Sequence, residues 1–194
     1  MENVMEDTKC FNIEIIREIM SGNKKVIEYK NNIDFDDINT THKILNENKI
    51  MTDNIIFNSN KISVSNNFTH KLDRKNSMIC DYVIKNNILY VIAKTSWNEL
   101  HSDHESGHMD GIKIFEAARQ AMLFSQHFYG VEFGKEVLLT KSDINYKQII
   151  EDDVEIILQV YTLTKGFGKS HTVFNIFQNN QLKADGYFIT YIKH

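Results

Sequence analysis

The hydrophobic positions of this chain form one long apolar segment, at residues 112–128, and several shorter runs on either side of it. The long segment has no internal glycine and is rich in residues that favour helices. Asp110 and Gly111 can begin a helix there, and Gly130 can end it. The pattern therefore predicts a helix over about residues 111–129. Because apolar side chains cover nearly its whole circumference, we expect this helix to be buried.

The shorter runs are rich in β-branched and aromatic residues, which is typical of strands. Two of them, residues 78–84 and 88–95, flank an Asn-Asn pair that suits a tight hairpin turn. Four more follow the helix, at residues 135–141, 154–164, 171–178 and 182–193. A single apolar helix between two groups of antiparallel strands can bury all its faces only if the sheet curls around it.

Three polar residues interrupt the middle of the predicted helix. Glu116, Arg119 and Gln120 have the spacing i, i+3 and i+4, so they fall on one narrow stripe. Burying an unpaired carboxylate or guanidinium is costly. These groups therefore either satisfy one another, as an ion pair of Glu116 with Arg119, or line a pocket. If Glu116 is a site residue, we expect Glu116→Gln to abolish activity with little loss of thermal stability.

Three histidines, His101, His104 and His108, precede the helix in a polar loop. Histidine titrates near neutral pH, so it is a common proton shuttle and metal ligand. His104 and His108 would share one face of a helix and could then bind a metal. Gly107 argues against a rigid helix, so we expect no metal site. We predict a catalytic role for at least one of the three, with exposed loop residues as the alternative.

The composition is that of an ordinary globular domain, with 194 residues, 42% of them apolar and 25% charged. The net charge of -4 gives no basic surface for nucleic acid or for an anionic membrane, so neither is an expected partner. The two cysteines are too few for a disulfide framework. The chain has no apolar signal core and no run long enough to cross a bilayer, so we expect a cytoplasmic protein.

The stretch His108-Met-Asp-Gly111-Ile-Lys-Ile-Phe-Glu116-Ala-Ala-Arg119-Gln120 resembles the signature of the AfsA-type family of A-factor biosynthesis hotdog proteins. In that family a histidine and a glycine precede a helix that carries Glu-Ala-x-Arg-Gln. The stretch is more distantly similar to the hydroxyacyl-carrier-protein dehydratases, although Asp110 stands where proline is usual. The resemblance implies an α+β hotdog fold, with an antiparallel sheet wrapped around one long central helix. It predicts a single hotdog domain at residues 41–194, preceded by an N-terminal extension, residues 1–40, with a possible short helix.

The resemblance also implies roles for the residues of this stretch and of the preceding loop. Glu116 takes the place of the dehydratase acid, and His101 lies one position from that of the dehydratase histidine. His104 and His108 are the alternatives, so the expected catalytic residues are Glu116 and these three histidines.

The remaining residues of the stretch are expected to bind substrate. Gly111 takes the place of the family glycine, and Arg119 and Gln120 match the AfsA-type motif. Arg119 would either hold Glu116 or bind an anionic group of a substrate. Gln120 could instead be structural.

The function implied by the resemblance is transfer of a β-ketoacyl group to a small hydroxylated acceptor, in signal or specialised-metabolite biosynthesis of the butyrolactone type. The alternatives are a 3-hydroxyacyl-thioester dehydratase or a thioesterase and, from another class, a non-catalytic acyl- or signal-binding module. We expect no tightly bound cofactor. The thioester carrier would be coenzyme A or the phosphopantetheine of an acyl carrier protein, which is then a possible partner. Because hotdog sites usually form between two domains, we also expect a homodimer.

Overall fold

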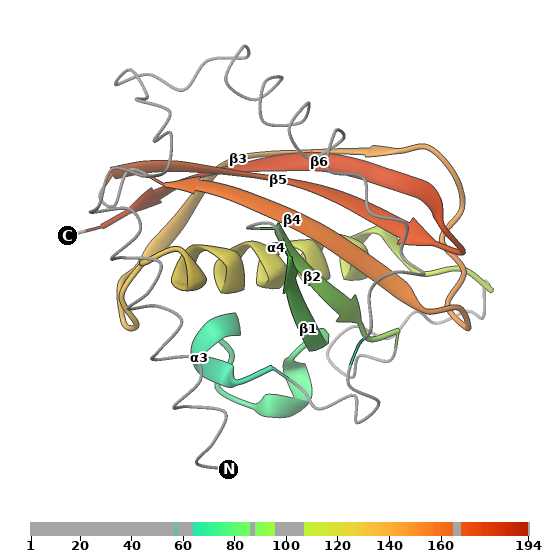
Figure 1. The fold of residues 1–194 in the computed structure, drawn as a ribbon, viewed down its shortest axis with the longest axis horizontal. Coiled ribbons are helices and arrows are strands. Elements are labelled where there is room, and N and C mark those ends of the chain that lie inside the picture. The colour runs from blue at the N-terminus through green and yellow to red at the C-terminus, as the bar shows by residue number, and fades with distance from the viewer. Residues whose placement is uncertain (1–56, 58–63, 86–87, 96–106, 165–167, 194) are drawn as a thin grey trace.

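The computed structural model describes residue 57 and residues 64–85, 88–95, 107–164 and 168–193 (Figure 1). The predicted N-terminal extension, residues 1–40, lies outside the described residues, as do His101 and His104. No helix in the described part of the chain is long and apolar enough to span a membrane.

The described helices are α3 (Asn66–Thr69), the 3-10 helix η2 (Arg74–Asn76) and α4 (Gly111–Phe128). The described strands are β1 (Ile79–Lys85), β2 (Ile88–Ala93), β3 (Val137–Tyr146), β4 (Ile156–Thr164), β5 (Gly168–Gln178) and β6 (Gln181–Ile192). The helix predicted over residues 111–129 is α4. It ends next to Tyr129, and Gly130 follows with a φ of 106°, a backbone conformation that glycine adopts readily.

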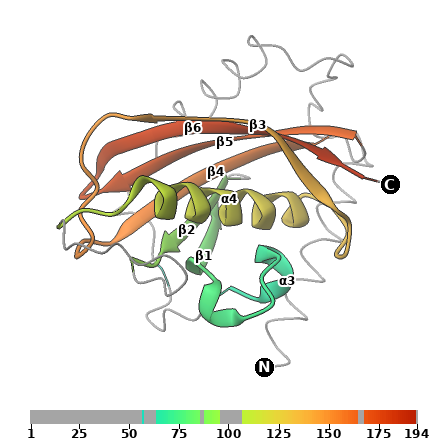
Figure 2. The same cartoon turned by 180° about the vertical axis from the view of Figure 1, so that it is seen from behind.

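The strands form one antiparallel sheet in the order β1-β2-β4-β5-β6-β3. The sheet curves over α4, which lies along its concave side (Figures 1 and 2). Asn179 and Asn180 join β5 to β6 with φ values of 50° and 61°, the left-handed conformation that a two-residue hairpin loop needs. The predicted α+β hotdog fold, an antiparallel sheet around one long helix, is confirmed.

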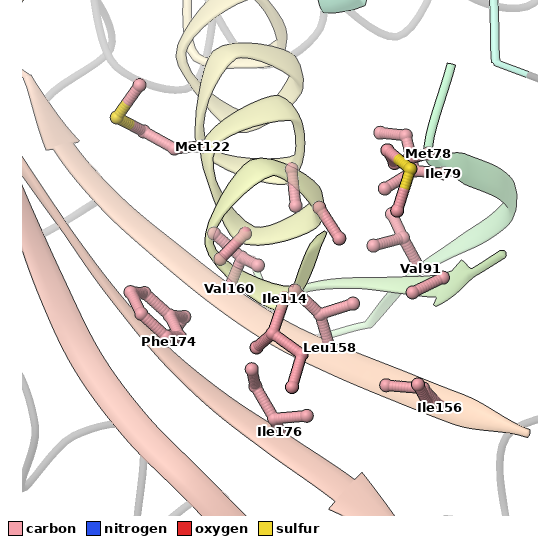
Figure 3. Packing of buried hydrophobic residues seen from close by; sticks show 14 of the residues in the cluster. Met78, Ile79, Val91, Ile114, Met122, Ile156, Leu158, Val160, Phe174 and Ile176 are labelled. Atoms are coloured by element: carbon pink, nitrogen blue, oxygen red, sulfur yellow. The ribbon is translucent and has the colours of Figure 1, made fainter. Parts of the chain in front are cut away.

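The hydrophobic core lies between α4 and the sheet. Figure 3 shows Ile114 and Met122 of α4 in the cluster with Leu158, Val160 and Phe174 of the central strands, and all five are at most 3% exposed. Alanines 117, 118 and 121 belong to the same cluster. Their small side chains allow the helix backbone to approach its neighbours closely, so the core is filled by packed side chains.

The edge strand β3 differs from its prediction, which covered only residues 135–141. It runs from Val137 to Tyr146 and pairs with β6 alone. Nearly all its side chains are exposed or half-buried. An edge strand without a buried face lacks the alternation of apolar and polar residues that reveals a strand in a sequence.

A segment that the sequence did not predict covers the side of α4 away from the sheet (Figures 1 and 2). We call residues 64–78, which include α3 and η2, the α3–η2 segment. The ring of Phe68 in α3 lies 4.6 Å from the ring of Phe124 in α4, and Val64 and Met78 are buried in the core cluster. This segment therefore covers the face of α4 opposite the sheet and reaches the polar stripe of Glu116, Arg119 and Gln120.

Candidate functional site

The polar stripe of α4 is centred on the carboxylate of Glu116, whose side chain is 12% exposed. Arg119 donates from Nε to Oε2 at 2.7 Å and from Nη2 to Oε1 at 2.8 Å. Two parallel hydrogen bonds between a guanidinium and a carboxylate are among the strongest polar contacts in proteins. The ion pair of Glu116 with Arg119, which the sequence left open, is therefore present.

Gln120 and the α3–η2 segment complete the set of groups around Glu116. The Gln120 side-chain amide donates to Glu116 Oε1 at 2.9 Å and to the carbonyl oxygen of Asn76 at 3.0 Å. Its own oxygen accepts the backbone amide of Met78 at 2.7 Å. Lys71 Nζ lies 3.1 Å from Glu116 Oε1. The amide of Gln120 is fully occupied by these partners and fixes the segment to α4.

The electrostatic environment keeps Glu116 ionised. Burial alone raises the pKa of this carboxyl, but the hydrogen bonds from Arg119 and Gln120, the positive charge of Arg119 and the contact with Lys71 outweigh it and lower the pKa to about 2. A carboxylate with so low a pKa is a weak proton acceptor at neutral pH. In this geometry Glu116 is suited to orienting or stabilising positive charge more than to removing a proton.

A second feature lies at the beginning of α4, where an open cavity of about 420 Å³ is lined by His108, Gly111, Ile114, Tyr146 and residues 147–150. The hydroxyl of Tyr146 donates to the carbonyl oxygen of Gly111 at 3.0 Å. Gly111 leaves room for this contact, because a Cβ at that position would lie 3.2 Å from the Tyr146 hydroxyl oxygen. The end of β3 and the first turn of α4 are therefore joined at the cavity.

The loop before α4 brings His108 to the same cavity. His108 is exposed, and its backbone forms an isolated antiparallel bridge with Glu151. The next residue is anchored as well, since the Met109 amide donates to the carbonyl oxygen of Ile150 at 2.8 Å. Two backbone contacts on consecutive residues position His108 at the start of the helix.

The predicted site residues thus fall into two groups on α4. His108 and Gly111 line the cavity. The network of Glu116, Arg119 and Gln120 lies further along the helix, and these three residues do not line the cavity. The first group lies at the helix start and the second one to three turns along it.

The described residues contain no group of three or more His, Cys, Asp and Glu side chains that could bind a metal ion. His101 and His104 lie outside these residues. The sequence reasoning missed Lys71, which contacts Glu116, and Tyr146, which covers Gly111. Both come from other elements of the chain, so no local pattern around the helix could reveal them.

Comparison with known proteins identifies the family. The family model described as the A-factor biosynthesis hotdog domain matches residues 57–192. The chain belongs to this family. The resemblance seen in the stretch from His108 to Gln120 is thereby confirmed, and the match extends over every strand that the structure describes, β1 to β6. None of the curated proteins compared with the chain matches it.

Several solved structures resemble the hotdog domain at low sequence identity. An uncharacterized protein from Pyrococcus horikoshii is 19% identical, with a TM-score of 0.51, over 69% of this chain and 95% of its own. A conserved protein from Pseudomonas aeruginosa is 18% identical, with a TM-score of 0.47, over 58% of this chain and 86% of its own. A hypothetical thioesterase from Streptococcus pneumoniae, solved with coenzyme A, is 16% identical, with a TM-score of 0.47, over 58% of this chain and 88% of its own. Because its sequence identity is low, the similarity to the Pyrococcus horikoshii protein supports the fold alone.

Proposed function

We propose that this hotdog domain acts on an acyl thioester and transfers a β-ketoacyl group to a small hydroxylated acceptor. The observation that carries the proposal is the cavity at the start of α4, which combines a helix N-terminus with an imidazole. Coenzyme A or the phosphopantetheine of an acyl carrier protein would carry the thioester. The family match supports this reaction, since the family is described by a biosynthetic role.

The backbone at the helix start supports a role in binding the thioester carbonyl. The amides of Lys113 and Ile114 donate to the carbonyl oxygen of Asp110, whose side chain makes no capping hydrogen bond. Within the described part of the chain, the amides of Gly111 and Ile112 have no acceptor. Donors at a helix N-terminus stabilise the negative charge that develops on a carbonyl oxygen under attack.

In the proposed reaction the acceptor hydroxyl oxygen attacks the thioester carbonyl carbon, a new C–O bond forms, and the C–S bond breaks to release the thiol. An imidazole takes the hydroxyl proton and returns it to the leaving sulfur. His108 is the imidazole at the cavity in the described chain, and His101 and His104 of the same loop are the alternatives. Gly111 binds the carbonyl oxygen through its amide.

Glu116 serves this reaction indirectly, because its carboxylate holds the charged groups of Arg119 and Lys71 in position. Arg119 uses two of its five N–H donors on Glu116, and its remaining donors would bind an anionic group of an acceptor that extends beyond the cavity along α4. Gln120 supports both by fixing the α3–η2 segment.

A homodimer fits the exposed edge of the sheet. β3 lies at one end of the strand order, and its side chains Leu138 and Leu139 are 42% and 38% exposed. An exposed edge strand offers unpaired backbone groups to another strand. We propose that two copies pair along β3, so that the partner also borders the cavity at Tyr146.

The proposal is tested by incubating the full chain with β-ketoacyl, 3-hydroxyacyl and saturated acyl thioesters, with and without dihydroxyacetone phosphate, and following products by mass. An acylated acceptor supports transfer. An enoyl product would indicate a dehydratase and a free acid a thioesterase. Tight binding of the thioester without turnover would favour a non-catalytic acyl-binding module instead.

The variant His108→Gln examines the site itself, with Glu151→Gln as its control. The backbone of Glu151 pairs with His108, but its side chain is exposed, so the control keeps the loop geometry. We expect a fall in turnover of about 100-fold or more for His108→Gln, the usual contribution of general base catalysis. Equal activity of both variants would remove His108 from the mechanism.

A further inference from the structure

Two histidines outside the proposed site are in direct contact where the α3–η2 segment meets the end of α4. The Nε2 atoms of His70 and His127 are 2.7 Å apart, and their ring centroids are 4.9 Å apart. His70 follows α3 in the left-handed backbone conformation, with a φ of 54°. His127 is in the last turn of α4 and is 3% exposed. One ring is therefore open to solvent and the other is buried.

The neighbouring carbonyl determines which nitrogen of each ring carries a proton. His127 Nδ1 lies 2.8 Å from the carbonyl oxygen of Val131, which can only accept, so Nδ1 must donate. A neutral His127 then has a bare Nε2, and this atom accepts. His70 Nε2 must therefore carry a proton and donate to it. This hydrogen bond exists only while His127 is neutral.

The surroundings of the two rings oppose positive charge. Burial lowers the pKa of His70, and so do the proximity of His127 and the positive charge of Arg119 on α4. Burial lowers the pKa of His127 more than the Val131 carbonyl raises it. In the part of the chain that the structure describes, the uncharged rings of Phe68 in α3 and Phe133 after α4 also lie against His127. Within the described chain, no carboxylate contributes to either shift.

The contact between the two rings helps to determine the position of Lys71. This lysine follows His70 directly, and its Nζ lies 3.1 Å from Glu116 Oε1. Further along the segment, Asn76 and Met78 are hydrogen-bonded to Gln120 of α4. Release of His70 would therefore free the end of the segment that brings Lys71 to Glu116.

We propose that the His70–His127 hydrogen bond is an acid-sensitive latch that holds the α3–η2 segment, and with it Lys71, on α4. The first proton goes to the exposed Nδ1 of His70 and leaves the hydrogen bond intact. The second goes to Nε2 of His127, removes the acceptor, and places two N–H groups against each other. The part of the segment around His70 and Lys71 then separates from α4, and Glu116 loses a cation. The latch itself is independent of the proposed function, and only its effect on the reaction rests on it.

The direction of the pH dependence follows from the lowered pKa values. The open state takes up protons near the ordinary histidine value of 6.5, and the closed state does so only at lower pH. The latch is therefore fully closed above 6.5 and weakens as the pH falls below it. In the pH range where opening takes up one proton, the equilibrium constant for opening increases about tenfold for each unit by which the pH falls.

The first experiment records long-range proton–nitrogen NMR spectra of the imidazoles in the full chain at pH 7.5. We expect His127 to be protonated at Nδ1 and bare at Nε2, and His70 to be protonated at Nε2. Protonation of His127 at Nε2 in the neutral ring would overturn the latch. Neither this experiment nor the next measures turnover. Both therefore test the histidine contact even if the protein does not catalyse the proposed reaction.

The second experiment compares hydrogen exchange of residues 64–78 between pH 7.5 and 5.5, corrected for intrinsic rates. We expect the segment to open at least tenfold more at pH 5.5. In His70→Asn, which removes one of the two titrating imidazoles but tolerates the left-handed backbone, opening should be greater at pH 7.5 and should depend less on pH, because only His127 still takes up a proton on opening. The matched control is Phe133→Leu, which loosens the packing on His127 without removing a titrating group and should keep the pH dependence. An equal pH dependence in wild type and His70→Asn would refute the proposal.

Discussion

The substitution Glu116→Gln gives the most direct measurement of the network on α4. It keeps the shape of the side chain and removes the charge that Arg119 and Lys71 contact at 2.7 and 3.1 Å. The pKa of Glu116 falls from the ordinary value of 4.5 to about 2, which corresponds to ~3 kcal/mol of folding free energy at neutral pH. The variant should lose a contribution of about this size. For a chain of this size, that loss lowers the melting temperature by about 6–12 °C. The sequence alone predicted little loss of stability, and the structure changes that expectation.

The assay is urea unfolding of wild type and variant between pH 2 and pH 7. A carboxyl whose pKa is lowered in the folded state stabilises the protein above its unfolded pKa, and this contribution is lost as the pH falls from about 4.5 to about 2. We expect the two unfolding free energies to differ at pH 7 and to converge at the acid end. Glu132→Gln is the control, since Glu132 is 75% exposed and its partner Lys135 is 4.0 Å away. The reasoning is refuted if Glu116→Gln matches the stability of wild type throughout.

Three further substitutions test other parts of the structure. Gly186→Ala should destabilise the fold by about 1–3 kcal/mol in urea unfolding, because the new Cβ would lie 2.2 Å from the Asp143 carbonyl oxygen, and an unchanged midpoint would contradict this contact. Leu138→Lys should convert the proposed dimer into a monomer in light scattering, because a charge on an edge strand opposes pairing. A wild-type chain that is monomeric at micromolar concentration would exclude the proposed dimer. Tyr146→Phe removes the hydrogen bond to the Gly111 carbonyl oxygen, so turnover should fall while the melting temperature changes little. A melting temperature that falls with turnover unchanged would make Tyr146 structural only.

Much of the fold was predictable, because the relevant information is local. Apolar residues cover nearly the whole circumference of the helix, and Gly130 follows its end, so the extent of α4 and its burial from Ile114 onward follow from the sequence. The first turn is the exception, since Ile112 is 58% exposed. The Asn179-Asn180 turn indicates a hairpin for the same reason. The strand β3 was placed less well, because its exposed residues 142–146 owe their conformation to pairing with β6.

The candidate site was predictable only along the helix. The spacing of Glu116, Arg119 and Gln120 revealed a shared stripe, and the i, i+3 rule allowed the ion pair that forms. Lys71 and His70 reach α4 from the unpredicted α3–η2 segment, and no periodic pattern links residues so far apart in the sequence. Against the opposing effect of burial, the lowered pKa of Glu116 comes mainly from Arg119 and Gln120 on the same stripe, with a smaller effect of Lys71. The sequence could not reveal its value because burial and the contact with Lys71 depend on the tertiary fold.

The alanines of α4 have a consequence for the size of any substrate. They let the helix approach its neighbours so closely that leucine, valine and phenylalanine side chains fill the space beneath the strands. If a fatty chain binds in the cavity at the helix start, this packing leaves it little room to enter the core between α4 and the sheet. In the proposed dimer, a second copy paired along β3 would then contribute to selection for chain length. Enlarging a core residue such as Val160 should impair folding long before it alters which chain length is preferred.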